Sequence, residues 1–100
     1  MTLDVAFNEG AWLDYDEIYA WIADHSDAET ANRYLSRLLD FCDSLSEFPL
    51  RGPRREDLMP GIRTIVFENK ALVVYQVDGR EVRIVRILHK GRDPGSAFRA

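Results

Sequence analysis

The fold of this chain is decided by residues 71–88, whose sequence is ALVVYQVDGREVRIVRIL. At the centre, Asp78-Gly79 is a two-residue hairpin signal, because both positions of such a turn adopt a positive φ. The segment before it, Ala71 to Val77, is apolar except for Gln76, as is typical of a strand covered on both faces. Glu81 to Leu88 supplies the returning strand. The stretch therefore predicts two antiparallel strands.

A third strand of the same sheet precedes this hairpin. Ile62 to Phe67 is a further β-rich run, and Glu68-Asn69-Lys70 separates it from the next strand. Asn69 tolerates the left-handed conformation that a short turn requires. The three runs predict an antiparallel meander with strands near 62–67, 71–77 and 81–88.

The N-terminus predicts a short strand followed by a helix. From Thr2 to Phe7 apolar and polar residues alternate, which indicates a strand with one buried side. Asn8 follows as a candidate N-cap, because its side-chain oxygen can accept a hydrogen bond from a first-turn amide. From Glu9 to about His25 apolar residues recur at steps of three and four, which predicts an amphipathic helix.

A second helix is predicted over residues 26–48. Ser26 and Glu29 have the spacing of a capping box, and Pro49 ends the helix because it has no backbone amide to donate. The two helices are joined by only a few residues, so they fold back as an antiparallel hairpin. The order β-α-α-β-β-β predicts a single α+β domain over residues 1–100, with the hairpin packed on one face of an antiparallel sheet.

The composition, 46% hydrophobic and 30% charged, is that of a globular protein. Residues 1–48 carry a net charge of −9 and residues 49–100 carry +5, so the basic half can face an acidic partner. The net charge of −4 argues against sequence-specific nucleic-acid binding. Cys42 is alone and at a helical core position, which predicts a buried thiol. The absence of a signal peptide or an apolar span predicts a cytoplasmic chain with no membrane contact.

No cofactor or metal is expected from the motifs. His25 and His89 are predicted to lie far apart, no phosphate-binding glycine loop is present, and the carboxylates of the first helix are interpreted as a solvated face.

The arginines are the more informative residues, because their planar guanidinium groups match the oxygens of carboxylates and phosphates. Arg83 and Arg86 are an odd number of residues apart, so they point to opposite faces unless a bulge intervenes, and at most one shares a face with Arg63. Ordinary solvated arginines remain an alternative. Other basic residues lie in the 49–61 loop and the tail, namely Arg51, Arg54, Arg55, Lys90, Arg92 and Arg99.

Several segments together resemble the RelE/ParE toxin superfamily along nearly the whole chain, and its ParE-like branch in particular. The first-helix segment WLDYDEIYAWI is similar to the pattern of ParE-like members. The other matching segments are ANRYL at 31–35, FPxxG at 48–52, LxxGIR at 58–63, VYxV at 74–77 and VxIVRILHxxRD at 82–93.

The resemblance implies one of two activities. RelE-like members cleave mRNA in the ribosomal A site with basic side chains and a C-terminal aromatic hydroxyl, whereas ParE-like members poison DNA gyrase. Matched to the RelE pattern, this chain keeps Arg63 and Arg92, has Ile65 and Leu72 where RelE has basic residues, and has Phe98 near the tyrosine position. Isoleucine and leucine cannot stabilise a pentavalent phosphate. The expectation is a gyrase inhibitor, with Arg92 and Phe98 as target-binding residues.

Two alternatives stay open: a ribonuclease that uses Arg63, His89 and Arg92, and a non-toxic remnant that only binds an antitoxin. The resemblance also implies a ParD-like antitoxin as partner. Its expected contacts are apolar residues outside the main stripe of the first helix, together with arginines of the basic half: Leu13, Trp21, Arg63, Arg83 and Arg86. The alternative is that the aromatics pack within the hairpin and that the arginines are solvated.

Overall fold

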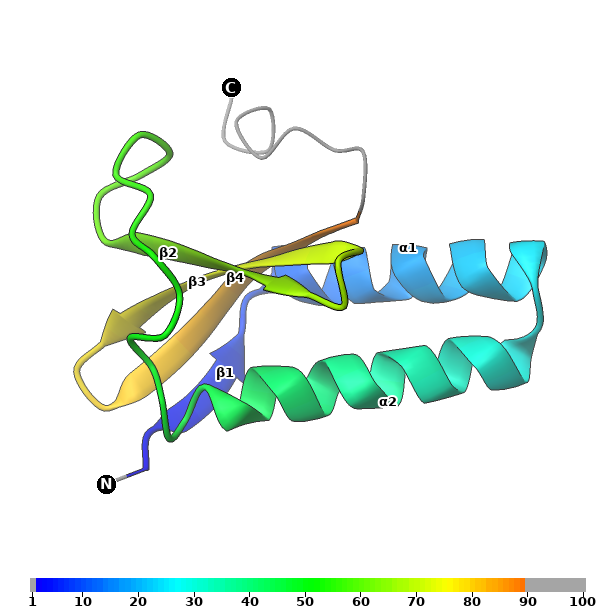
Figure 1. Cartoon of the computed structure of the whole chain (residues 1–100), viewed down its shortest axis with the longest axis horizontal. Helices are drawn as coiled ribbons and strands as arrows, with labels where there is room; N and C mark the ends of the chain where they lie inside the picture. Colours follow the sequence, from blue (N-terminus) through cyan, green and yellow to red (C-terminus); the bar gives the residue numbers. More distant parts are fainter. Residues whose placement is uncertain (1, 90–100) are drawn as a thin grey trace.

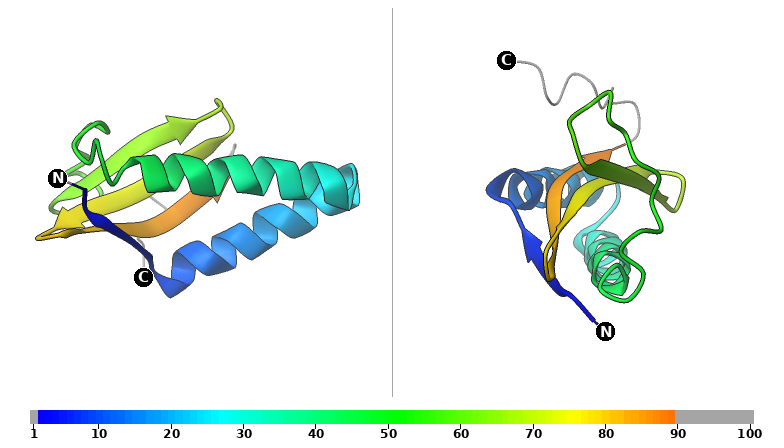
Figure 2. Two further views of the ribbon diagram at one scale, coloured as in Figure 1. Left: turned by 90° about the horizontal axis from the view of Figure 1, so that it is seen from below. Right: turned by 90° about the vertical axis from the view of Figure 1, so that its left-hand side faces the viewer.

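The predicted order of elements is confirmed in the computed structural model, which describes residues 2–89 (Figure 1). Two 17-residue helices lie side by side as an antiparallel hairpin and cover one face of the sheet (Figure 2). The elements are β1 (Asp4–Phe7), α1 (Glu9–His25), α2 (Ala28–Ser44), β2 (Ile62–Phe67), β3 (Ala71–Asp78) and β4 (Glu81–His89).

The four strands form one sheet in the order β1-β4-β3-β2. Strands β2, β3 and β4 make the predicted antiparallel meander. The sheet is nevertheless mixed rather than antiparallel throughout, because β1 pairs in parallel with β4, from Asp4 opposite Glu81 to Phe7 opposite Ile84. Parallel neighbours need a long crossover connection, and here the helical hairpin, the loop after it and strands β2 and β3 lie between β1 and β4.

Both turns of the meander use the left-handed conformation. Gly79 has the predicted positive φ, 61°, but Asp78 does not: it ends β3 opposite Glu81, so the two-residue turn is Gly79-Arg80 rather than the predicted Asp78-Gly79. In the other turn Glu68 joins Asn69 at a positive φ, 49° and 59°, although only Asn69 has a side chain that favours it. The bidentate hydrogen bonds between Glu68 and Arg37 of α2 help to hold this turn against the helix.

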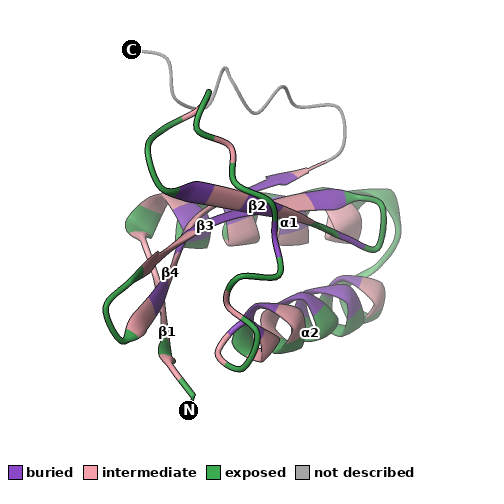
Figure 3. Cartoon of the chain, turned by 60° about the vertical axis from the view of Figure 1, so that its left-hand side comes forward, coloured by how far each residue is buried: buried purple, intermediate pink, exposed green. Residues whose placement is uncertain are grey.

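The main core lies between the hairpin and the sheet, where the inner sides of the helices are buried (Figure 3). Leu35, Leu38 and Cys42 of α2 pack there against Tyr75 of β3. Cys42 is buried as predicted, and burial raises the pKa of its thiol to about 12, so it remains protonated and unreactive. A smaller cluster of Ile62, Val74 and Leu88 lies on the other face, so β3 is covered on both sides as its sequence indicated.

The helix ends differ from the predictions in three details. Asn8 is the N-cap of α1, but its side chain makes no capping hydrogen bond and instead accepts one from Arg83. The N-cap of α2 is Asp27 rather than Ser26, and its carboxylate accepts a hydrogen bond from the amide of Thr30 at 2.6 Å. Helix α2 ends at Ser44 instead of residue 48, because the next amides tighten into turns, with Leu45 N donating to Cys42 O.

Within residues 2–89, neither helix is long and apolar enough to cross a membrane.

Candidate partner-binding site

Arg63 is held by the loop that follows α2. Its Nη1 donates to the carbonyl oxygen of Gly52 at 2.8 Å and to that of Leu50 at 3.3 Å. The buried Tyr75 hydroxyl fixes the same segment, since it accepts from Gly52 N at 2.9 Å and donates to Pro49 O at 2.8 Å. A Cβ on Gly52 would lie 2.6 Å from the Thr64 carbonyl oxygen, so only glycine fits there. These contacts give the predicted FPxxG segment a structural role.

Arg86 is paired inside the molecule. Its Nε and Nη2 donate to the two carboxylate oxygens of Asp14 at 2.7 and 2.9 Å. Asp14 also accepts a hydrogen bond from the backbone amide of Ile87 at 2.9 Å, beyond the end of β1. The carboxylate raises the pKa of Arg86. Asp14 is only 4% exposed, so its assignment to a solvated helix face was wrong.

Arg83 and Arg86 share one face of the sheet because a bulge intervenes at Val85. In the strand register, Arg83 lies opposite Gln76 of β3 and Arg86 lies opposite Val74. Residues two apart on β3 point to the same side of the sheet, so the two arginines do as well. Arg63 pairs with Tyr75 and so lies on the opposite face, the one that the helices cover. Arg83 donates to Asn8 Oδ1 at 3.0 Å and to Glu81. The three predicted arginines therefore do not form one cationic surface.

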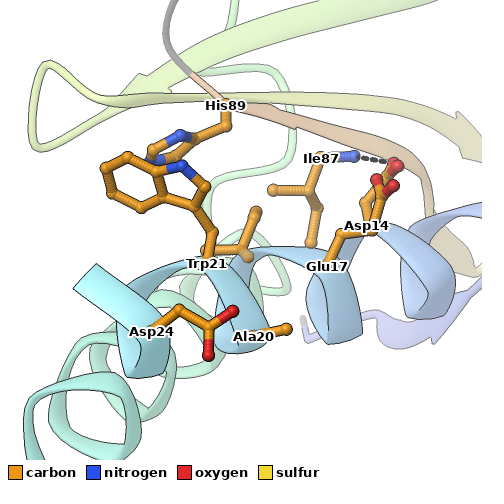
Figure 4. A pocket seen from close by; sticks show the side chains of 8 residues that line it. Asp14, Glu17, Ala20, Trp21, Asp24, Ile87 and His89 are labelled. Carbon is orange, nitrogen blue, oxygen red and sulfur yellow. Dashed lines mark hydrogen bonds between the residues drawn. The ribbon is translucent and has the colours of Figure 1, made fainter. Parts of the chain in front are cut away.

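Trp21 is the centre of an exposed aromatic cluster at the C-terminal end of α1. The side chain is 51% exposed, and its ring stacks on that of His25 with centroids 4.2 Å apart. The ring of His89, at the end of β4, lies 5.4 Å from that of Trp21 (Figure 4). His25 Nδ1 lies 2.8 Å from the carbonyl oxygen of Trp21. The prediction that the two histidines lie far apart was wrong, because the end of β4 reaches the last turns of α1.

A pocket of about 470 Å³ lies beside Trp21, between α1 and the end of β4 (Figure 4). Its lining carries three carboxylates together with apolar and aromatic groups: Asp14, Glu17, Ile18, Ala20, Trp21, Asp24, Ile87 and His89. Leu13, which is 59% exposed, lies one helical turn before Glu17 on the same stripe. Two of the predicted antitoxin contacts, Leu13 and Trp21, thus belong to one surface of α1.

The remaining predicted residues are placed as follows. Arg92 and Phe98 lie outside the described residues. Arg63 and His89 occupy different ends of the sheet: Arg63 aligns through Tyr75 with Ile84 of β4, and His89 is five residues further along, roughly 15 Å at the rise of a strand. Among residues 2–89, no three His, Cys, Asp or Glu side chains gather in a way that suits a metal ion.

Solved structures share the fold of this chain. Among solved structures, the chain resembles the chromosomal ParDE toxin–antitoxin system from P. aeruginosa, with a TM-score of 0.78 and 24% identity over 88% of this chain and 96% of that one. It also resembles the RelBE2 toxin–antitoxin complex from Mycobacterium tuberculosis, with a TM-score of 0.66 and 23% identity over 90% and 100% of the two chains. These likenesses establish a RelE/ParE-type toxin fold.

The sequence comparisons then specify the family. The model described as "ParE toxin of type II toxin-antitoxin system, parDE" matches residues 5–94. Toxin ParE3 of Caulobacter vibrioides is 33% identical over 75 residues, which are 75% of this chain and 74% of that protein. The chain belongs to the ParE family of toxins of type II toxin–antitoxin systems.

Proposed function

We propose that the chain inhibits DNA gyrase by binding it, that it does not cleave mRNA, and that a ParD-like antitoxin neutralises it in the cytoplasm. Membership of the ParE family supports the antitoxin partner, because the family and its solved neighbours are named for toxin–antitoxin systems.

The observation that carries the choice of target is the packing of Ile65 and Leu72. These residues stand where RelE-like ribonucleases have basic side chains, and both serve the core instead: Ile65 packs against the cluster under the helices, and Leu72 against the cluster on the other face. Neither can donate a hydrogen bond to a phosphate or stabilise its developing charge. Neither position therefore supplies the basic side chain that ribonuclease chemistry needs, and the two side chains point to opposite faces of the sheet.

The position of Arg63 points the same way. Its guanidinium already binds two loop carbonyl oxygens, and the candidate base His89 lies at the other end of the sheet. General acid–base chemistry requires both groups within hydrogen-bond reach of one substrate. Arg63 is better explained as an anchor for the 49–52 segment than as a phosphate ligand.

The test uses the purified chain in two parallel assays. We expect it to inhibit gyrase supercoiling or to accumulate gyrase-cleaved DNA, and to leave mRNA on ribosomes intact. Arg92→Glu and Phe98→Ala should weaken gyrase inhibition at least tenfold, whereas Arg80→Glu, a charge reversal at the exposed β3–β4 turn, should not. Codon-dependent mRNA cleavage with gyrase unaffected would reverse the proposal, and inactivity in both assays would favour the non-toxic remnant.

A further inference from the structure

A second pocket, of about 480 Å³, lies on the other side of Trp21 from the pocket between α1 and the end of β4. Trp21 and His89 line both pockets, so the aromatic pair forms a ridge between them. The second pocket is bounded by α1, α2 and the β2–β3 turn, and its lining consists of Trp21, Ile22, Thr30, Arg33, Tyr34, Arg37, Lys70 and His89.

The charges of the two pockets are opposite. Among the described residues, the lining of the pocket along α1 contains Asp14, Glu17 and Asp24 and no lysine or arginine, and Asp14 is paired with the nearby Arg86. The pocket on the α2 side is lined by Arg33, Arg37 and Lys70, with no carboxylate in its lining within residues 2–89. We call these the acidic pocket and the basic pocket.

The cations of the basic pocket remain accessible to a partner. Arg33 pairs with Glu29 at 3.2 Å, but both side chains are exposed, and such i,i+4 pairs contribute little in water. Arg37 is bound to Glu68 while its guanidinium also lies over the ring of Tyr34. The buried Tyr34 hydroxyl has no hydrogen-bond partner among the described residues. A carboxylate entering this pocket can replace Glu29 as the partner of Arg33 at small cost.

We propose that the two pockets form one groove with a fixed polarity, occupied by a single segment of a partner protein. The segment places a basic residue in the acidic pocket, an apolar residue on Trp21, and an acidic residue in the basic pocket. Each pocket has room for a few side chains, and a half-exposed tryptophan between them is the kind of residue that dominates binding energy at interfaces. Charges placed at the two sides fix the direction in which the segment lies.

The inference rests on the proposed antitoxin partnership and names the part of the antitoxin that this groove takes. The test measures the dissociation constant of the full chain with the proposed ParD-like antitoxin. Asp24→Lys in the acidic pocket and Arg33→Glu in the basic pocket should each weaken binding at least tenfold. The matched controls Asp16→Lys and Arg80→Glu reverse exposed charges outside both pockets and should stay within threefold.

Compensating changes test the polarity. Antitoxin variants in which single Lys or Arg residues become Glu should restore binding to Asp24→Lys but not to Arg33→Glu, and Asp or Glu to Lys changes should do the reverse. Pocket variants that bind as tightly as the controls overturn the groove while the antitoxin partnership stands. If no antitoxin binds the parent chain, the proposed function itself fails. If light scattering shows a dimer of the free chain that Asp24→Lys disrupts, the groove belongs to a second copy and the proposal is wrong.

Discussion

The two ends of α1 carry one exposed tryptophan each, yet the two surroundings are of opposite kinds. At the N-terminal end, Trp12 stacks on Phe7 of β1 with ring centroids 4.5 Å apart and meets Tyr15 at 5.6 Å. Two residues further along, Asp14 is buried against Arg86. At the C-terminal end, Trp21 contacts two imidazoles and faces two pockets.

The exposed fraction does not distinguish the two tryptophans, since Trp12 is 44% and Trp21 51% exposed. What differs is the role of the neighbours. The partners of Trp12 join the first strand to the helix, so its ring stabilises the fold. The partners of Trp21 leave space on both sides, so its ring is available to another molecule. We refer to residues 7–14 as the closed end of α1 and to residues 21–25 as the open end.

The largest expected effect comes from breaking the closed end at Asp14. Asp14→Ala leaves the Arg86 charge and the Ile87 amide without their acceptor, so we expect the free energy of unfolding to fall by about 3 kcal/mol. Urea denaturation measures it. Asp16→Ala, which truncates an exposed carboxylate on the same helix, should change stability by no more than about 0.5 kcal/mol.

A double variant shows whether the loss is due to the unpaired charge. Asp14→Leu with Arg86→Met removes both charges, so it should be more stable than Asp14→Ala, although the Ile87 amide stays unsatisfied. A loss of less than about 1 kcal/mol for Asp14→Ala would mean that the closed end does not depend on this pair.

Most of the fold was predictable from the sequence because its signals are local. Hairpin turns, apolar periodicity and the proline after α2 each act within a few residues, and they located both helices and all four strands. The pairing of β1 with β4 was not predictable in this way. It joins residues about 77 apart in the chain, and no residue of β1 alone encodes a parallel neighbour.

The site was less predictable, since it depends on which residues tertiary packing brings together. Leu13 and Trp21 stood out as surplus apolar residues, and they do lie on one surface. The burial of Asp14 was indicated by its spacing in the sequence. Ala11, Asp14 and Ile18, the buried residues of α1, follow one another at steps of three and four, but the more prominent apolar stripe of the helix drew attention away from them. No sequence signal indicated that His89 approaches Trp21, because the bulge at Val85 changes which side chains of β4 point to which face of the sheet.

The second prediction exchanges the roles of the two tryptophans. Trp12→Ala should lower the free energy of unfolding by about 1–2 kcal/mol, because it removes the ring contact with Phe7 that ties β1 to α1 and the contact with Tyr15 within the helix. It should leave antitoxin affinity within threefold. Trp21→Ala should cost less than about 1 kcal/mol of stability and weaken antitoxin binding about 30-fold, the loss of an interface anchor. Equal losses of affinity in the two variants, measured by calorimetry, would remove the distinction between the ends.

The smallest expected effect on stability comes from the N-cap of α2, which lies just beyond the open end of α1. Ser26 was expected to begin α2 but is instead the C-cap of α1, with its amide donating to Ile22 O at 2.8 Å. Asp27 caps α2, and the hydrogen bond from the Thr30 amide lowers the pKa of its carboxyl below the ordinary value. Because Asp27 is exposed, this is a local contribution to helix stability rather than a buried ion pair.

The cap predicts a pH dependence whose sign follows from the lowered pKa. A carboxyl that ionises more readily in the folded state stabilises the protein above the ordinary Asp pKa, and this contribution disappears as the pH falls through the lowered value. Asp27→Ala should therefore reduce the melting temperature by a few degrees at pH 7, and the gap to the parent should narrow toward pH 2. Ser26→Ala should match the parent at both pH values. If Ser26→Ala is instead the more damaging change, Ser26 rather than Asp27 supplies the cap that stabilises α2, and the prediction is wrong.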